Sequence, residues 1–106
     1  MGWADRYIKN LQEGKTVQFR PFGNSMSGRI ESKQLVTVEP CPQGSGSCVV
    51  GEIVLCKVRG AQYLHIVKAI RLGKKGIEVQ IGNNKGHVNG WTSRDNIYGR
   101  VVRVEP

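Results

Sequence analysis

The sequence predicts a mostly β domain with one short N-terminal helix. The chain has 14 glycines among 106 residues and only 39% hydrophobic residues, a composition that favours many short strands over long helices. From Thr16 onward apolar and polar residues alternate with a period of two, which is typical of half-buried strands. The length suits one domain, residues 1–106, with a helical segment over 1–14 and a β-domain over 16–104.

A helix is expected over about residues 3–12, because Trp3, Tyr7, Ile8 and Leu11 recur at the spacing of one helical face. Gly14 follows the last of them at a position where helices commonly end. The first strand contains Val17 and Phe19, and the later strands are expected over residues 34–39, 52–58, 61–70, 77–81 and 97–104. Loops are expected over residues 40–51 and 82–96.

Charge and cysteine content limit the functional classes. The net charge is +8, but the basic residues are spread along the chain, so a general basic protein is favoured over a dedicated nucleic-acid binder. No apolar run is long enough for a membrane span or a signal peptide, which predicts a soluble, cytoplasmic protein. The three cysteines, Cys41, Cys48 and Cys56, lack metal-site spacing; we expect thiols, with a Cys41–Cys48 disulfide as the alternative, and neither metal nor cofactor.

The tetrapeptide Gly23-Asn24-Ser25-Met26 follows the first predicted strand. A small serine at the end of a strand, two residues after a glycine, is one way to present a nucleophile. The same pattern also makes an ordinary turn. Both interpretations stay open on these residues alone.

Six motifs together resemble the LexA/signal-peptidase superfamily of serine peptidases, in the family order over about residues 17–104. The first is the nucleophile turn around Ser25, and the others are Leu35-Val36-Thr37-Val38, Gly51-Glu52-Ile53-Val54, Tyr63-Leu64-His65-Ile66-Val67, Gly82-Asn83-Asn84 and Tyr98-Gly99-Arg100-Val101. The resemblance implies a fold of short, strongly bent strands. It also implies a small, stand-alone bacterial or phage-type serine peptidase that cleaves an extended peptide or protein.

The family places a Lys or His general base on the strand that matches residues 61–70. His65 stands at the matching position and suits a base near neutral pH, whereas Lys68 needs burial to lower its pKa. Strand alternation puts Tyr63, His65 and Val67 on one face and Leu64, Ile66 and Lys68 on the other, unless a bulge intervenes. We favour His65, with Lys68 as the alternative base.

Further roles follow from the resemblance. The family's His-using members orient the imidazole with an aspartate in or after the Gly-Asp-Asn turn, where this chain has Asn83 and, further on, Asn89. An amide supports an imidazolium less well than a carboxylate does, so slow turnover is expected. The backbone amides of Asn24 and Ser25 would form the oxyanion hole. Substrate contacts are expected from Val17, Phe19 and Met26 on the adjacent strand edge and turn.

Two other functions remain open. The missing aspartate, and Ser27-Gly28 in place of the family's usual residues after Ser-Met, fit a binding module for a protein partner that has lost catalysis. The second alternative is a small nucleic-acid binder that uses the densest mix of basic and aromatic residues, namely Lys85, His87, Trp91 and Arg94.

Overall fold

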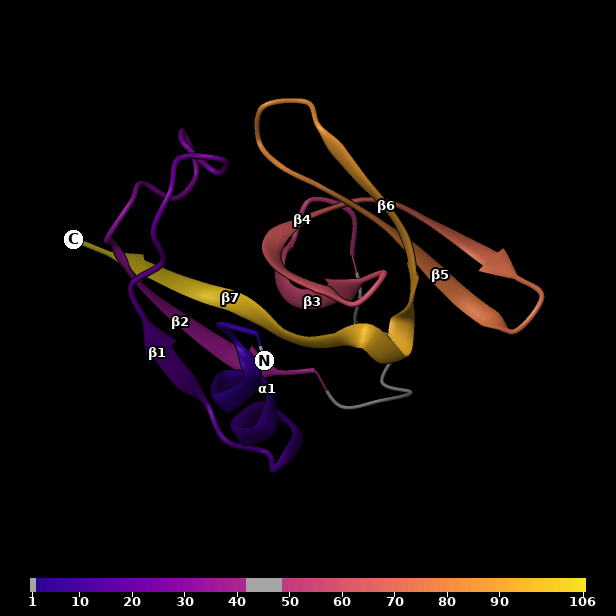
Figure 1. Cartoon of the computed structure of the whole chain (residues 1–106), viewed down its shortest axis with the longest axis horizontal. Helices are drawn as coiled ribbons and strands as arrows, with labels where there is room; N and C mark the ends of the chain where they lie inside the picture. The colour runs from indigo at the N-terminus through magenta and orange to yellow at the C-terminus, as the bar shows by residue number, and fades with distance from the viewer. Residues whose placement is uncertain (1, 42–48) are drawn as a thin grey trace.

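The structure is a computed structural model that describes residues 2–41 and 49–106, and it confirms the mostly β class with a short N-terminal helix (Figure 1). Within these residues seven antiparallel strands form one sheet in the order β1-β2-β7-β3-β4-β5-β6. The elements are α1 (Asp5–Gln12), β1 (Val17–Phe19), β2 (Leu35–Pro40), β3 (Ile53–Val58), β4 (Ala61–Gly73), β5 (Gly76–Gly82), β6 (Val88–Ser93), the 3-10 turn η1 (Arg94–Asn96) and β7 (Ile97–Glu105).

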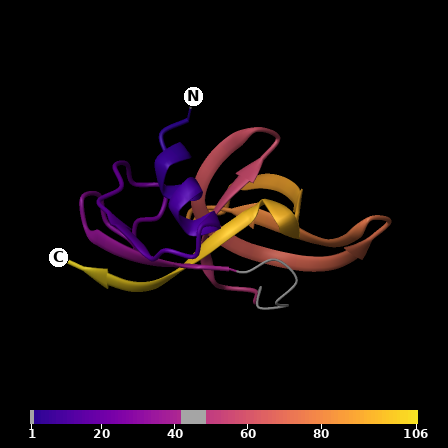
Figure 2. The same cartoon turned by 90° about the horizontal axis from the view of Figure 1, so that it is seen from below.

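Helix α1 begins two residues later than its sequence pattern predicts. Asp5 accepts a hydrogen bond from the Gly2 amide at 2.9 Å, so residues 2–4 form a turn that leads into the helix. Ile8 and Leu11 are buried, and the helix packs against β1, β2 and β7 (Figures 1 and 2). Trp3 therefore lies before the helix and is not part of its buried face.

The predicted loop over residues 82–96 is wrong from Val88 onward, where the chain forms β6 and η1. Strand β6 pairs with β5 through Gln80↔Trp91 and Val79↔Thr92, and it stands at the edge of the sheet. An edge strand tolerates polar residues and glycine because one of its sides needs no partner. Asn89-Gly90 therefore fits within β6, although an Asn-Gly pair more often marks a turn.

The sheet carries a buried apolar layer on each side. One layer includes Val36, Leu55 and Leu64 together with residues of α1, and the other includes Val54 and Val67. Strand β3 contributes to both layers, which explains why its residues 53–56 are all buried. The far ends of β4 and β5 extend as a hairpin away from α1 and from the C-terminus (Figure 2).

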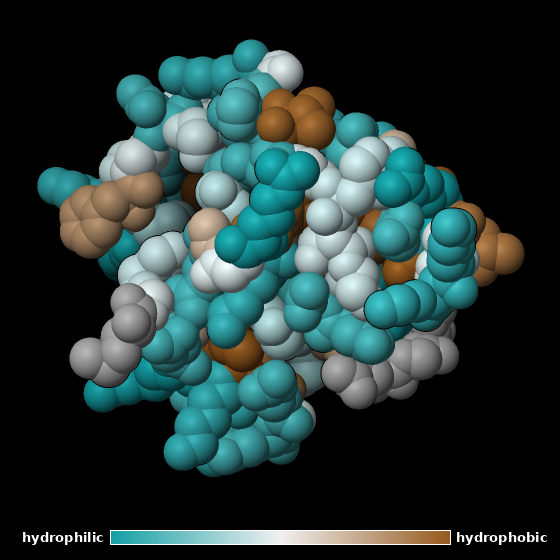
Figure 3. Space-filling view, turned by 45° about the vertical axis from the view of Figure 1, so that its right-hand side comes forward, coloured by the Kyte–Doolittle hydropathy of each residue, from teal (hydrophilic) through white to brown (hydrophobic). Residues whose placement is uncertain are grey.

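The molecular surface agrees with the basic, polar composition. In the face drawn in Figure 3, hydrophilic side chains predominate and hydrophobic ones form separate patches. No helix within residues 2–41 and 49–106 is long and apolar enough to cross a membrane. Cys41 and Cys56 are buried, whereas Cys48 and the suggested Cys41–Cys48 disulfide lie outside the described residues.

Folding stability should depend on the buried side chains of β3. The Leu55 side chain is fully buried, so Leu55→Ala should lower the free energy of unfolding by about 2–5 kcal/mol through lost burial and a residual cavity. Leu72 is 83% exposed, and the matched Leu72→Ala change should stay within about 0.5 kcal/mol. Urea denaturation of both variants measures the difference, and equal losses would contradict the assigned core.

Candidate functional site

Ser25 stands on a tight turn that the core anchors. Gly23 has φ +102°, a left-handed conformation that favours glycine, and it redirects the chain after β1. Residues 24–30 then coil through bonds from the Ser27 amide to the Asn24 carbonyl and from the Ile30 amide to the Met26 carbonyl. Met26 is 5% exposed and belongs to the α1-side layer, so the turn is fixed next to a half-buried Ser25.

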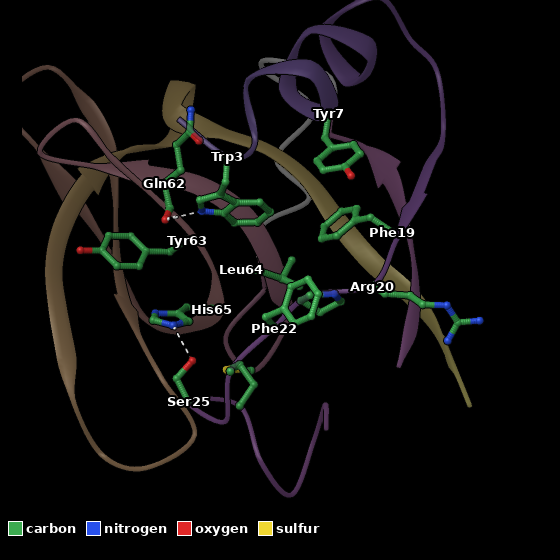
Figure 4. Close-up of a pocket in the computed structure, with 13 residues that line it drawn as sticks. Trp3, Tyr7, Phe19, Arg20, Phe22, Ser25, Gln62, Tyr63, Leu64 and His65 are labelled. Carbon is green, nitrogen blue, oxygen red and sulfur yellow. Dashed lines mark hydrogen bonds between the residues drawn. The ribbon is translucent and has the colours of Figure 1, made fainter. Parts of the chain in front are cut away.

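A hydrogen-bonded chain joins three side chains from separate segments. Ser25 Oγ lies 3.2 Å from His65 Nε2, the contact drawn as a dashed line in Figure 4, and His65 Nδ1 lies 2.7 Å from Asn89 Oδ1. An amide oxygen only accepts, so the imidazole proton sits on Nδ1 and the Nε2 lone pair faces the serine. Ser25 then donates its hydroxyl proton to Nε2, the direction in which a general base receives it.

The environment of His65 favours its neutral form. Its side chain is 8% exposed, and the Tyr63 ring stacks on it with centroids 5.0 Å apart. Burial lowers the pKa of His65 below its usual 6.5, the hydrogen bond to Asn89 opposes that change, and the positive charges of His87 and Lys68 lower the pKa further. The imidazole is thus uncharged at neutral pH, with its proton on Nδ1 and Nε2 as the acceptor.

Lys68, the alternative base, lies at a β-bulge. The register between β4 and β5 shifts between Val67 and Ala69, which interrupts the alternation on which the two-face prediction rested. A Cβ placed on Gly82 would come within 3.0 Å of Lys68 Cε and 2.6 Å of the His87 carbonyl oxygen. The Lys68 stem therefore lies against the Gly82 backbone, while the Ser25 hydroxyl donates its hydrogen bond to His65.

The turn after β5 supports the serine. Asn84, which sequence reasoning did not single out, donates its amide to the Ser25 carbonyl at 3.1 Å and its side chain to the Ser27 carbonyl at 2.7 Å. Asn83 instead accepts from the Lys85 and His87 amides through Oδ1 and so shapes its own turn. No sequence signal identified Asn84 beyond its place in the Gly-Asn-Asn turn.

The two amides predicted as an oxyanion hole are available. The Asn24 carbonyl is used in the turn, but within the described residues the Asn24 and Ser25 amides donate no hydrogen bond. Unpartnered amides at the start of a helical turn are the normal consequence of its geometry.

A groove of about 490 Å³ opens at Ser25 and His65 (Figure 4). Two of the predicted substrate contacts, Phe19 and Met26, line it, whereas Val17 is buried opposite Val38 in the sheet and is not among the lining residues. The remaining lining residues, most of which were not predicted, are Trp3, Tyr7, Arg20, Pro21, Phe22, Gly23, Gln62, Tyr63 and Leu64.

The four residues of the nucleic-acid alternative do not share one exposed surface. Lys85 and His87 are exposed on the β5–β6 turn, but Arg94 is only 7% exposed. The guanidinium of Arg71 lies 3.9 Å from the centroid of the Trp91 ring and covers one of its faces. Among the described residues, no group of three or more His, Cys, Asp and Glu side chains is placed to hold a metal ion.

Comparisons with known proteins add no relative: no family model, no curated protein and no solved structure matches this chain.

The low pKa of His65 makes folding stability depend on pH. Between the folded-state pKa and 6.5, the unfolded chain binds more protons at this residue than the folded chain does. The His65 contribution to the free energy of unfolding should consequently fall as pH drops below about 6.5 and level off below the folded pKa. Urea unfolding from pH 4.5 to 8 should show this slope in the wild type and lose it in His65→Gln. Parallel pH profiles for the two proteins would refute a depressed pKa.

Proposed function

We propose that the protein is a serine peptidase of the LexA/signal-peptidase type, with Ser25 as nucleophile and His65 as general base. The observation that carries the proposal is the 3.2 Å approach of Ser25 Oγ to a buried His65 Nε2 whose other nitrogen is held by Asn89. A nucleophile, a base and a group that orients the base are the three parts required for acyl transfer by serine.

The chemistry proceeds in two halves. Ser25 Oγ attacks the scissile carbonyl carbon while its proton moves to His65 Nε2, and the Asn24 and Ser25 amides are the proposed donors to the developing oxyanion. The imidazolium returns that proton to the leaving amine as the peptide bond breaks. Water then attacks the acyl carbon and gives a proton to Nε2. The bond between that carbon and Ser25 Oγ breaks, and Nε2 returns the proton to Oγ, which restores the serine hydroxyl.

The substrate is an extended peptide. Strand β1 pairs with β2 on one side only, and its continuation through Pro21 lines the groove beside Ser25. An added peptide strand would use such an edge for backbone hydrogen bonds. Pro21 has no amide proton, so pairing along this edge would weaken where the chain turns toward the nucleophile.

Asn89 favours slow turnover and supports one alternative, a peptide-binding module on the same framework. A neutral amide fixes the imidazole tautomer but gives no charge to stabilise the imidazolium that forms in the transition state. A module would keep the groove and the hydrogen bonds and would lack measurable cleavage.

Covalent labelling tests the nucleophile. A fluorophosphonate probe, which reacts with activated serine hydroxyls, should label the wild type at Ser25 and leave Ser25→Ala unlabelled. Ser27→Ala is the matched control, because it removes a serine hydroxyl two residues away. Asn84 contacts the backbone carbonyl of Ser27, which this substitution keeps. Intact-protein and peptide mass spectrometry give the site. Absence of labelling in the wild type at pH 8 would favour the binding module.

Replacement of the orienting amide by an acid tests the role of Asn89. Asn89→Asp keeps an acceptor at His65 Nδ1 and adds a negative charge, so it should raise the pKa of His65. It should also increase the labelling rate by at least about tenfold. Asn89→Leu removes the acceptor and should slow labelling. Rates measured against pH should show the acid limb of Asn89→Asp at higher pH than in the wild type. An unchanged rate in both variants would remove Asn89 from the mechanism.

A further inference from the structure

We propose that the end of the groove remote from Ser25 is a subsite for one bulky apolar side chain, aromatic or leucine-like, of an extended peptide. This inference rests on the proposed function for the peptide nature of the ligand. Its own support is the construction of the groove wall, the exposure of two aromatic rings, an open strand edge and the charge of the lining.

The wall of this subsite is aromatic. Tyr7 stacks on Phe19 with ring centroids 4.4 Å apart, and Trp3 meets Phe19 edge-on at 5.8 Å. All three line the same groove as Ser25 and His65 (Figure 4). Aromatic rings that are fixed by one another offer a large apolar surface at little further cost in conformational entropy.

The segment before α1 is tied to β4, and this holds Trp3 in the wall. Gln62 Oε1 accepts the Ala4 amide at 2.7 Å, and the Gln62 side chain also donates to Asp5. Trp3 Nε1 donates to the Gln62 carbonyl at 3.4 Å. The indole N–H thus fixes Trp3 beside Phe19, and the exposed part of its ring faces solvent as a contact surface.

Two aromatic side chains at the groove remain open to solvent. Phe22 is 82% exposed and Trp3 is 53% exposed, although both line the cavity. Apolar surface in a concave site next to polar groups is typical of a ligand pocket. A bulky apolar side chain placed between them would bury part of each ring.

The open edge of β4 identifies the occupant as an extended backbone. Residues 61–65 pair with β3, and pairing with β5 begins only at Ile66. The Gln62 carbonyl points away from β3, because it accepts the Trp3 indole proton. Backbone groups of residues two apart point the same way in a strand, so the Leu64 amide and carbonyl face the groove and have no strand partner among the described residues. A peptide strand supplies the complementary donors and acceptors.

The charge of the lining excludes a basic side chain at this position. None of the described residues that line the groove is Asp or Glu, whereas Arg20 lines it and the chain has a net charge of +8. A lysine or arginine of the peptide would meet no counter-charge and would be repelled. The size of the aromatic wall and the charge of the lining therefore both favour a neutral, apolar side chain of the peptide.

The test uses Ser25→Ala with Trp91→Phe, in which Trp3 is the only tryptophan and cleavage is blocked. The probes are acetylated and amidated octapeptides of Ala, Ser and Gly with one Phe, Leu, Ala or Lys moved through each position. Peptides with Phe or Leu at one particular position should shift Trp3 emission to the blue and bind at least about tenfold more tightly than those with Ala or Lys there. Equal affinity for Phe, Ala and Lys peptides would overturn the subsite.

A matched pair of variants locates the effect. In the same background, Phe22→Ala should weaken binding of the Phe peptide by about three- to tenfold and leave the Ala peptide unchanged. Leu72→Ala removes an apolar side chain of almost equal exposure, 83%, from the β4–β5 hairpin and should change neither peptide. Equal losses in the two variants would contradict a role for Phe22 in the groove.

Wild-type protein separates this inference from the proposed function. Selective binding of Phe peptides without cleavage or labelling would leave the subsite in place and reject the peptidase. Cleavage that requires Ser25 but ignores the bulky residue would keep the peptidase and reject the subsite. Neither binding nor cleavage of any octapeptide would reject both.

Discussion

The exchange of partners along strand β4 is the constraint on which both the fold and the candidate site depend. The strand pairs with β3 from Ala61 to Ile66 and with β5 from Ile66 onward, so the two halves of the sheet share this one strand. Because β5 arrives late, the backbone edge at Leu64 stays open to the groove. Because β5 then runs back along β4, the turn that follows it brings Asn84 against the serine turn, and β6 brings Asn89 against the imidazole. If β5 paired along the whole of β4, it would fill the groove and remove the site.

The lowered pKa of His65 has two opposite consequences for its role as a base. Burial and the positive charges of Lys68 and His87 keep the imidazole neutral, which maintains it as an acceptor for the serine proton. The same effects penalise the imidazolium that must form when that proton arrives. A base with a lowered pKa is ready at neutral pH but takes up a proton less readily. Only the hydrogen bond to Asn89 works against these effects, and it does so without a charge.

Local patterns predicted most of the fold, and motif order predicted the pairing of the serine with the histidine. Alternation identified six strands, because apolar and polar residues repeat with a period of two along a half-buried strand. Strand β6 was missed since an edge strand accepts the Asn-Gly pair that elsewhere marks a turn. The aromatic wall was missed for another reason: Trp3 and Phe22 lie far from β4 in the sequence, and only the tie between Gln62 and the start of α1 brings Trp3 to the groove. No local signal encodes such a contact.

The site and the groove place different demands on the same few residues. Cleavage requires the charge on the imidazole to be stabilised during the reaction, whereas recognition requires only that the walls and the strand edges stay fixed. The chain meets the second demand fully: Met26 is buried beneath the serine turn, Gln62 fixes the wall, and Asn84 clamps the turn. It meets the first through geometry alone, because Asn89 orients the imidazole without compensating its charge. A single oxygen in place of a nitrogen at this side chain would add the missing charge without changing the framework. In the proposed peptidase, the strength of catalysis would therefore depend on one atom, and peptide recognition would be independent of it.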